Sequence, residues 1–83
     1  MTQDQIIEKI AAYLVQETAF AGITAPPEAD EALIEGGLLD SLGILSLIAF
    51  LEQEFDLVFD EEDISAEHFA TLRTMADLVH QKR

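Results

Sequence analysis

Apolar residues recur at helical spacing near the start of the chain. They form one stripe that comprises Ile6, Ile7, Ile10, Ala11 and Leu14. Thr2 and Gln5 have the spacing of a capping box, in which each side chain binds the backbone N–H of the other residue. The pattern predicts a helix from about Thr2 to Thr18.

A long connecting segment follows, from Ala21 to Asp40. The helical pattern stops there because glycines and prolines interrupt it, namely Gly22, Pro26, Pro27, Gly36 and Gly37. A connection of about twenty residues is unusually long for a small domain, which indicates a functional loop or a short internal turn.

Asp40 or Ser41 can cap a second helix, which runs to about Phe55. The face expected to lie against the core holds Ile44, Leu47, Ile48, Leu51 and Phe55. The opposite face holds Leu42, Leu45, Ser46, Ala49 and Gln53. This second face is also largely apolar, so the helix is either buried on nearly all sides or exposes an apolar stripe.

The remaining elements are short. An acidic connector, Asp56 to Asp63, precedes a short helical turn that begins near Ser65, and Thr71 caps a last helix. The apolar positions of that helix are Leu72, Met75, Ala76 and Val79. No strand pattern competes with these assignments. The prediction is an all-α, four-helix bundle, with three longer helices and one short helix, in a single domain over residues 1–83.

The charge of the chain is strongly unbalanced. Its 83 residues contain 17 acids and 4 bases, for a formal net charge of −13, and residues 31–63 contain ten acids and no base. Such a surface repels nucleic-acid phosphates and anionic membranes, so neither is expected as a partner. The acidic segment is either a solvated face or a docking surface for basic proteins.

The sequence also lacks the features of secretion and membrane insertion. No basic region precedes an apolar stretch at the N-terminus, and the longest uncharged run, residues 41–51, has eleven residues where a membrane span needs about 20. We expect a soluble, cytoplasmic monomer.

Metal binding and catalysis have little support. The segment from Asp56 to Glu67 fails as a calcium loop, because Val58 stands where an oxygen ligand is needed and Glu61 where the turn needs glycine. The chain has no cysteine. We expect His68 to be structural and His80 to be a solvated residue near a helix end, so an enzyme is disfavoured.

The stretch Gly37-Leu38-Leu39-Asp40-Ser41-Leu42 joins the long loop to the uncharged helix. An Asp-Ser-Leu triplet alone is a weak signal, because a helix N-cap after a glycine-rich loop explains it equally well. The triplet becomes a specific signal in its setting, because the chain is acidic, is expected to contain four helices and has a long loop before the triplet. In this setting the chain resembles the acyl and peptidyl carrier protein family, from the first helix through Val79. The resemblance implies a small acyl-carrier-like four-helix bundle.

The resemblance further implies that Ser41 receives a covalent 4′-phosphopantetheine arm from coenzyme A, whose thiol carries an acyl or aminoacyl thioester. The first turn of a helix suits a phosphodiester, because its backbone N–H groups are unsatisfied. Ser46, the competing hydroxyl, lies a full turn inside the helix. The implied partners are a phosphopantetheinyl transferase, an acyl- or aminoacyl-activating ligase and a downstream transferase or synthase. No catalysis by the chain itself is implied.

The second helix departs from the pattern of fatty-acid carriers, which usually place several acids just after Asp-Ser-Leu. Residues 42–51 contain none. The chain looks closer to stand-alone carriers of amino-acid-activating or polyketide pathways, to which the stretch Ile64 to Leu72 is also similar.

We expect partner enzymes to dock on the second helix by apolar contact, with its acids steering their approach. The expected docking residues are Asp40, Leu42, Leu45, Ala49 and Glu52. The alternative is an unmodified acidic helical adaptor that binds a basic protein partner.

Overall fold

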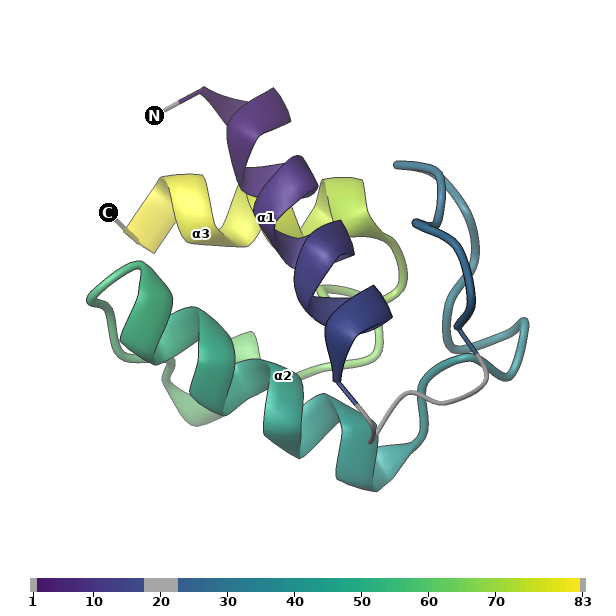
Figure 1. The fold of residues 1–83 in the computed structure, drawn as a ribbon. Coiled ribbons are helices and arrows are strands. Elements are labelled where there is room, and N and C mark those ends of the chain that lie inside the picture. Colours follow the sequence, from purple (N-terminus) through teal and green to yellow (C-terminus); the bar gives the residue numbers. More distant parts are fainter. Residues whose placement is uncertain (1, 18–22, 83) are drawn as a thin grey trace.

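Three α-helices and one 3₁₀ helix form the regular structure of residues 2–17 and 23–82, the part of the chain that the computed structural model describes. In chain order they are α1 (Gln3–Gln16), α2 (Ser41–Glu54), η2 (Glu61–Asp63) and α3 (Leu72–Lys82). Figure 1 shows α1 crossing α3, with α2 running beneath them and the segment 23–40 at one side. The all-α prediction is confirmed, and these described residues contain no strand.

The first helix begins with the predicted capping box. The Thr2 hydroxyl accepts a hydrogen bond from the Gln5 N–H at 3.2 Å, and Gln5 Oε1 accepts one from the Thr2 N–H at 2.8 Å. The helix ends at Gln16, and the predicted end at Thr18 lies outside the described residues, as do Ala21 and Gly22. The predicted stripe is buried except for Ile7, which is half-buried against the core.

The last helix, α3, also begins as predicted. Thr71 Oγ1 accepts a hydrogen bond from the Thr74 N–H, and Thr74 Oγ1 accepts one from the Thr71 N–H, both at 3.1 Å. Every predicted apolar position of α3 is buried, and α3 packs against α1. A hydrogen bond from the Gln3 side chain to Asp77 joins the two helices at the surface. α1 and α3 therefore form a packed pair of helices.

A fourth α-helix is not confirmed. The segment expected to be helical from Ser65 forms one hydrogen-bonded turn, in which the Phe69 N–H donates to the Ser65 carbonyl oxygen at 3.2 Å. The short regular element lies earlier, at η2, where Asp63 Oδ2 accepts from the Asp60 N–H at 2.8 Å. Two local side-chain caps, Asp63 Oδ2 on the Asp60 N–H and Ser65 Oγ on the His68 N–H, stabilise two separate turns. The first, η2, lies within the expected connector, and the second lies where the short helix was expected.

The long segment before α2 is attached to α3 by its backbone. The Leu33 N–H donates to the Ala70 carbonyl at 2.8 Å, and the Arg73 N–H donates to the Ala29 carbonyl at 2.9 Å. Arg73 Nε also lies 2.7 Å from Asp30 Oδ1, and this hydrogen bond lowers the pKa of Asp30. The long connection, whose length predicts an internal turn, is therefore held in a definite position beside the start of α3.

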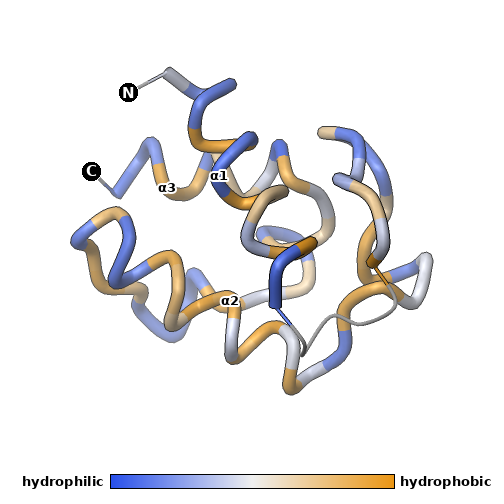
Figure 2. The backbone as a smooth tube through the Cα atoms, viewed as in Figure 1, coloured by the Kyte–Doolittle hydropathy of each residue, from blue (hydrophilic) through white to orange (hydrophobic). Residues whose placement is uncertain are grey.

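The apolar residues of α2 lie on two sides of the helix, and only one side faces the core. Figure 2 shows hydrophobic residues along much of its length. Leu47, Ile48, Leu51 and Phe55 are buried as predicted and Ile44 is half-buried, whereas Leu42 is 75% exposed and Leu45 61% exposed. Burial on nearly all sides is therefore excluded.

Among the described helices, none has the length and hydrophobicity needed to span a membrane.

Two leucines on α2 test this orientation of the helix. Leu47 is fully buried, so Leu47→Ala is expected to lower the free energy of unfolding by about 2–5 kcal/mol through lost contacts and a cavity. Leu45→Ala, a matched change on the exposed side, is expected to alter it by under about 0.5 kcal/mol. Urea titrations followed by circular dichroism measure both, and similar losses in the two variants would contradict the orientation.

Candidate functional site

The N-terminus of α2 is capped by Asp40. Its backbone is extended, with φ −116° and ψ −175°, and its Oδ1 accepts a hydrogen bond from the Gly43 N–H at 2.8 Å. The Ile44 N–H donates to the Asp40 carbonyl oxygen at 2.9 Å and closes the first turn. The sequence left the cap open between two residues; the structure places Asp40 at the cap and Ser41 at the first helical position.

Ser41 is exposed at this helix start. Within the described part of the chain, the N–H groups of Ser41 and Leu42 donate no hydrogen bond, because the cap satisfies only the N–H of Gly43. The Ser41 hydroxyl therefore stands beside two unsatisfied donors and the positive end of the helix dipole. This arrangement suits an anionic group attached to the hydroxyl.

The loop that delivers Asp40 needs its two glycines. A Cβ on Gly36 would lie 2.6 Å from the Ala32 carbonyl oxygen, and Gly37 has φ +79°, a conformation that side chains disfavour. Just beyond them, the Leu38 and Leu39 N–H groups both donate to the Leu33 carbonyl, at 2.8 and 3.1 Å. The close contact at Gly36 and the left-handed backbone at Gly37 fix the approach of the chain to α2.

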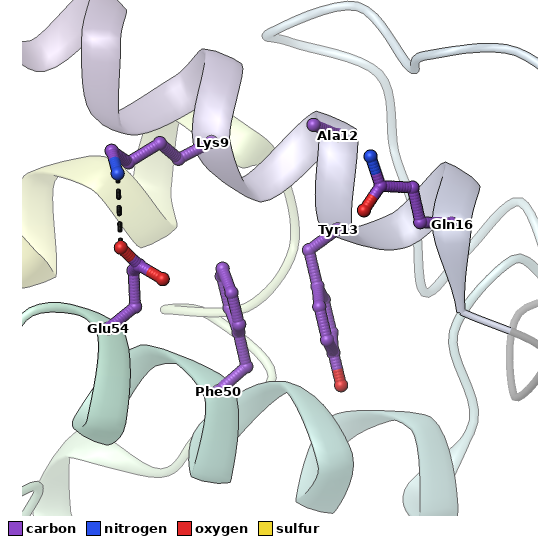
Figure 3. A pocket seen from close by; sticks show the side chains of 6 residues that line it. All are labelled: Lys9, Ala12, Tyr13, Gln16, Phe50 and Glu54. Atoms are coloured by element: carbon purple, nitrogen blue, oxygen red, sulfur yellow. Dashed lines mark hydrogen bonds and ion pairs between the residues drawn. The ribbon is translucent and has the colours of Figure 1, made fainter.

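An aromatic pair joins α2 to α1. The rings of Tyr13 and Phe50 are stacked, with centroids 4.0 Å apart and planes at 11°, and the Tyr13 hydroxyl donates to the Ser46 carbonyl oxygen at 3.3 Å. Figure 3 shows the two rings between the helices, beside the ion pair of Lys9 and Glu54, whose Nζ and Oε2 lie 3.0 Å apart. Burial, and then the charge of Glu17, raises the pKa of Tyr13.

The sequence patterns missed this stacked pair. Tyr13 and Phe50 each lie beside, not within, the apolar stripe of their helix, so neither periodicity pointed to them. One signal could have indicated the pair: each of the two neighbouring helices has an aromatic residue at the edge of its apolar stripe. The pair sets how α2 is turned, and so which of its residues meet water.

The expected docking residues divide into two groups. Asp40, Leu42, Leu45 and Ala49 are all exposed. Glu52 is only half-buried, and its Oε2 accepts a hydrogen bond from the Phe59 N–H at 2.9 Å, so this carboxylate already has a partner within the chain.

The two histidines lie apart from the start of α2. His68 Nδ1 lies 3.1 Å from Ser65 Oγ and 3.0 Å from the Asp63 carbonyl oxygen, and these contacts hold the turn before α3. His80 is exposed in the last turn of α3. No set of three or more acidic or histidine side chains in the described ranges is arranged to hold a metal ion.

Comparison with known protein families gives one match over most of the chain. The model of the phosphopantetheine attachment site matches residues 7–79. The chain belongs to this family. Carriers of the family bear a covalently attached 4′-phosphopantetheine group and are generally non-catalytic.

The start of α2 fits such a group. The two unsatisfied N–H groups at Ser41 and Leu42 can bind its phosphodiester, and the exposed hydroxyl leaves room for the attached arm. Asp40 opposes the fit in part, because its carboxylate places a like charge next to the phosphodiester. Residues 31–63 contain no base to offset that charge, so the backbone donors and the helix dipole would have to supply the attraction for a phosphodiester at this position.

The role of Asp40 as a cap can be separated from its charge. Asp40→Ala removes the acceptor for the Gly43 N–H and is expected to lower the free energy of unfolding by about 1 kcal/mol. Asp40→Asn keeps a side-chain oxygen and is expected to stay within a few tenths of a kcal/mol of the original protein. Thermal or urea unfolding measures both, and equal losses would show that charge, not capping, is the stabilising property.

Proposed function

We propose that Ser41 is the attachment site of the 4′-phosphopantetheine arm, and that residues 1–83 act as one carrier domain that delivers an acyl or aminoacyl thioester between biosynthetic enzymes. The arm supplies the thiol that holds the cargo. The observation that carries the proposal is the exposed Ser41 hydroxyl beside the two unsatisfied N–H groups, in a chain of the phosphopantetheine family.

The other serine of α2 is a weaker candidate. Ser46 is half-buried inside the helix, and its carbonyl oxygen accepts the hydrogen bond from Tyr13. Backbone N–H groups at an interior position are already bonded along the helix, so a phosphodiester there would find no donor.

The exposed side of α2 supports a docking role. Leu42 and Leu45 are 75% and 61% exposed, and Ala49 is exposed one turn further along. Large apolar side chains gathered on one exposed helix face mark an interaction site. We propose that the phosphopantetheinyl transferase, the activating ligase and the downstream synthase contact this face, with Asp40 at its start and the acids around Glu52 steering their approach.

The same face favours one class of pathway. Residues 42–51 are uncharged, so a partner must bind them by apolar burial and not by pairing with acids on the helix. We propose an amino-acid-activating or polyketide-type pathway in the cytoplasm, in place of fatty-acid synthesis. The ten acids of residues 31–63 support the alternative, an unmodified adaptor for a basic protein.

Attachment is tested by intact mass after incubation with coenzyme A and a broad-specificity phosphopantetheinyl transferase. The original protein and Ser46→Ala are expected to gain one phosphopantetheine group, whereas Ser41→Ala is expected to gain none, because it lacks the accepting hydroxyl. Circular dichroism checks that both variants fold. A full mass gain in Ser41→Ala contradicts the site, and no gain in any of the three proteins favours the adaptor.

Docking is tested with Leu45→Asp. The side chain is exposed, so the free energy of unfolding is expected to change by under about 0.5 kcal/mol. Loading of cargo by the cognate activating enzyme is expected to fall by about tenfold or more, because a charge enters an apolar contact. The matched control is Val15→Asp, a similar change at a residue that is 36% exposed on α1. Equal loading of Leu45→Asp and the original protein would remove Leu45 from the docking surface.

A further inference from the structure

The connector between α2 and the turn before α3, residues 57–64, has two buried anchors. Leu57 is 9% exposed and Phe59 7% exposed, while Val58 between them is 75% exposed. The ring of Phe59 meets that of Phe69 edge to face, with centroids 6.0 Å apart. The connector therefore forms a strap whose first part, residues 57–59, turns alternate side chains into the core, and η2 follows within the same segment.

A distinct backbone conformation begins this strap. Asp56 has φ +52°, in the left-handed region, and the Leu57 N–H donates to the Glu52 carbonyl oxygen at 3.1 Å. This is the geometry of a Schellman-type helix end, here with aspartate where glycine is usual. The chain turns away from α2 at Asp56 alone. The direction of the strap therefore depends on contacts made by the residues after Asp56.

Two charged side chains from different helices hold it. Glu52 of α2 accepts the Phe59 N–H at 2.9 Å. Lys82, in the last turn of α3, places its Nζ 3.1 Å from Asp60 Oδ2 and 2.7 Å from Asp63 Oδ2. Hydrogen bonds from Lys82 lower the pKa of Asp63, and those to Asp63 and Asp60 raise the pKa of Lys82, so the ion pair of Lys82 and Asp63 is charged at neutral pH.

The contacts made by Glu52 and Lys82 hold neighbouring residues of the strap, Phe59 and Asp60. Asp60 and Asp63 already cap η2 through the Asp60 N–H and the Asp63 N–H, which donates to the Asp60 carbonyl at 3.0 Å. This local capping brings two carboxylates together, and like charges at close range repel. Lys82 offsets that repulsion, and only Lys82 among the described bases has an ion pair on the strap.

We propose that Glu52 and Lys82 form a two-point clamp that holds residues 57–64 closed between the end of α2 and the end of α3. With the clamp closed, Leu57 and Phe59 stay in the core, and of the apolar side chains of the strap only Val58 and Ile64 face outward. With either point released, the strap opens about Asp56 and uncovers its two apolar anchors. The clamp does not involve the phosphopantetheine arm, so the result of its test is independent of the proposed function.

Amide hydrogen exchange of the full chain, read residue by residue by NMR at neutral pH and low salt, tests the Lys82 point. In Lys82→Met, the Asp63 and Ile64 N–H groups are expected to exchange about two- to fivefold faster, as the loss of an exposed ion pair implies. Lys9→Met is the matched control, because it removes the same charge and breaks an ion pair that does not touch the strap. Lys82→Arg is expected to restore slow exchange.

The Glu52 point has its own matched pair. Glu52→Ala is expected to speed exchange of the Phe59 N–H, whereas Glu54→Ala, two residues along on α2, loses the same charge and its pair with Lys9 and leaves Phe59 unchanged. The Ile10 and Leu14 amides report global unfolding. The clamp is overturned if either key variant leaves the strap amides unchanged, if its control has the same effect, or if the α1 amides accelerate by the same factor.

Discussion

The rotation of α2 about its axis decides which surfaces of this protein meet water. Hydrophobicity alone constrains that rotation weakly, because apolar residues occupy both sides of the helix. Contacts with the neighbouring helices therefore choose between the sides. Leu47 and Leu51 are fully buried, and the stacked pair of Tyr13 and Phe50, with its hydrogen bond to the Ser46 carbonyl, fixes the flank toward α1. Once that flank is fixed, Leu42 and Leu45 must face solvent.

Charge acts on a second level, by joining elements that the core does not join. Lys9 links α1 to Glu54 of α2, Arg73 links α3 to Asp30 of the long loop, and Lys82 links α3 to the strap after α2. Each pair is partly solvated and individually weak. In a chain with a formal net charge of −13, their placement matters more than their strength, because each of these three cations pairs with an acid from another element, and Lys82 pairs with two.

The sequence predicted the features that depend on local physics. Capping by Thr2 and Thr71, the stripe of α1 and the buried side of α2 all follow from spacing within one element, and all are confirmed. The short helix expected from Ser65 is reduced to one turn, and η2, which lies in the expected connector, was missed. The stacked aromatic pair and the contacts of Glu52 and Lys82 were also missed, because they join residues far apart in sequence. The motif indicated Ser41 as the candidate serine, whereas the unsatisfied N–H groups of Ser41 and Leu42 could be identified only from the geometry of the Asp40 cap.

The acids at the two ends of α2 have structural roles that leave the space between them uncharged. Asp40 occupies the Gly43 N–H at the start of the helix, and Glu52 occupies the Phe59 N–H near its end. A charge between them on the exposed side would add a desolvation cost to any partner that buries Leu42 and Leu45. In the proposed docking, acids confined to the ends and to the strap beyond would steer a basic partner by long-range attraction, while the contact itself would be apolar. The same division places the exposed Ser41 at the boundary between the Asp40 cap and the apolar side, next to the surface that a docking partner would bury.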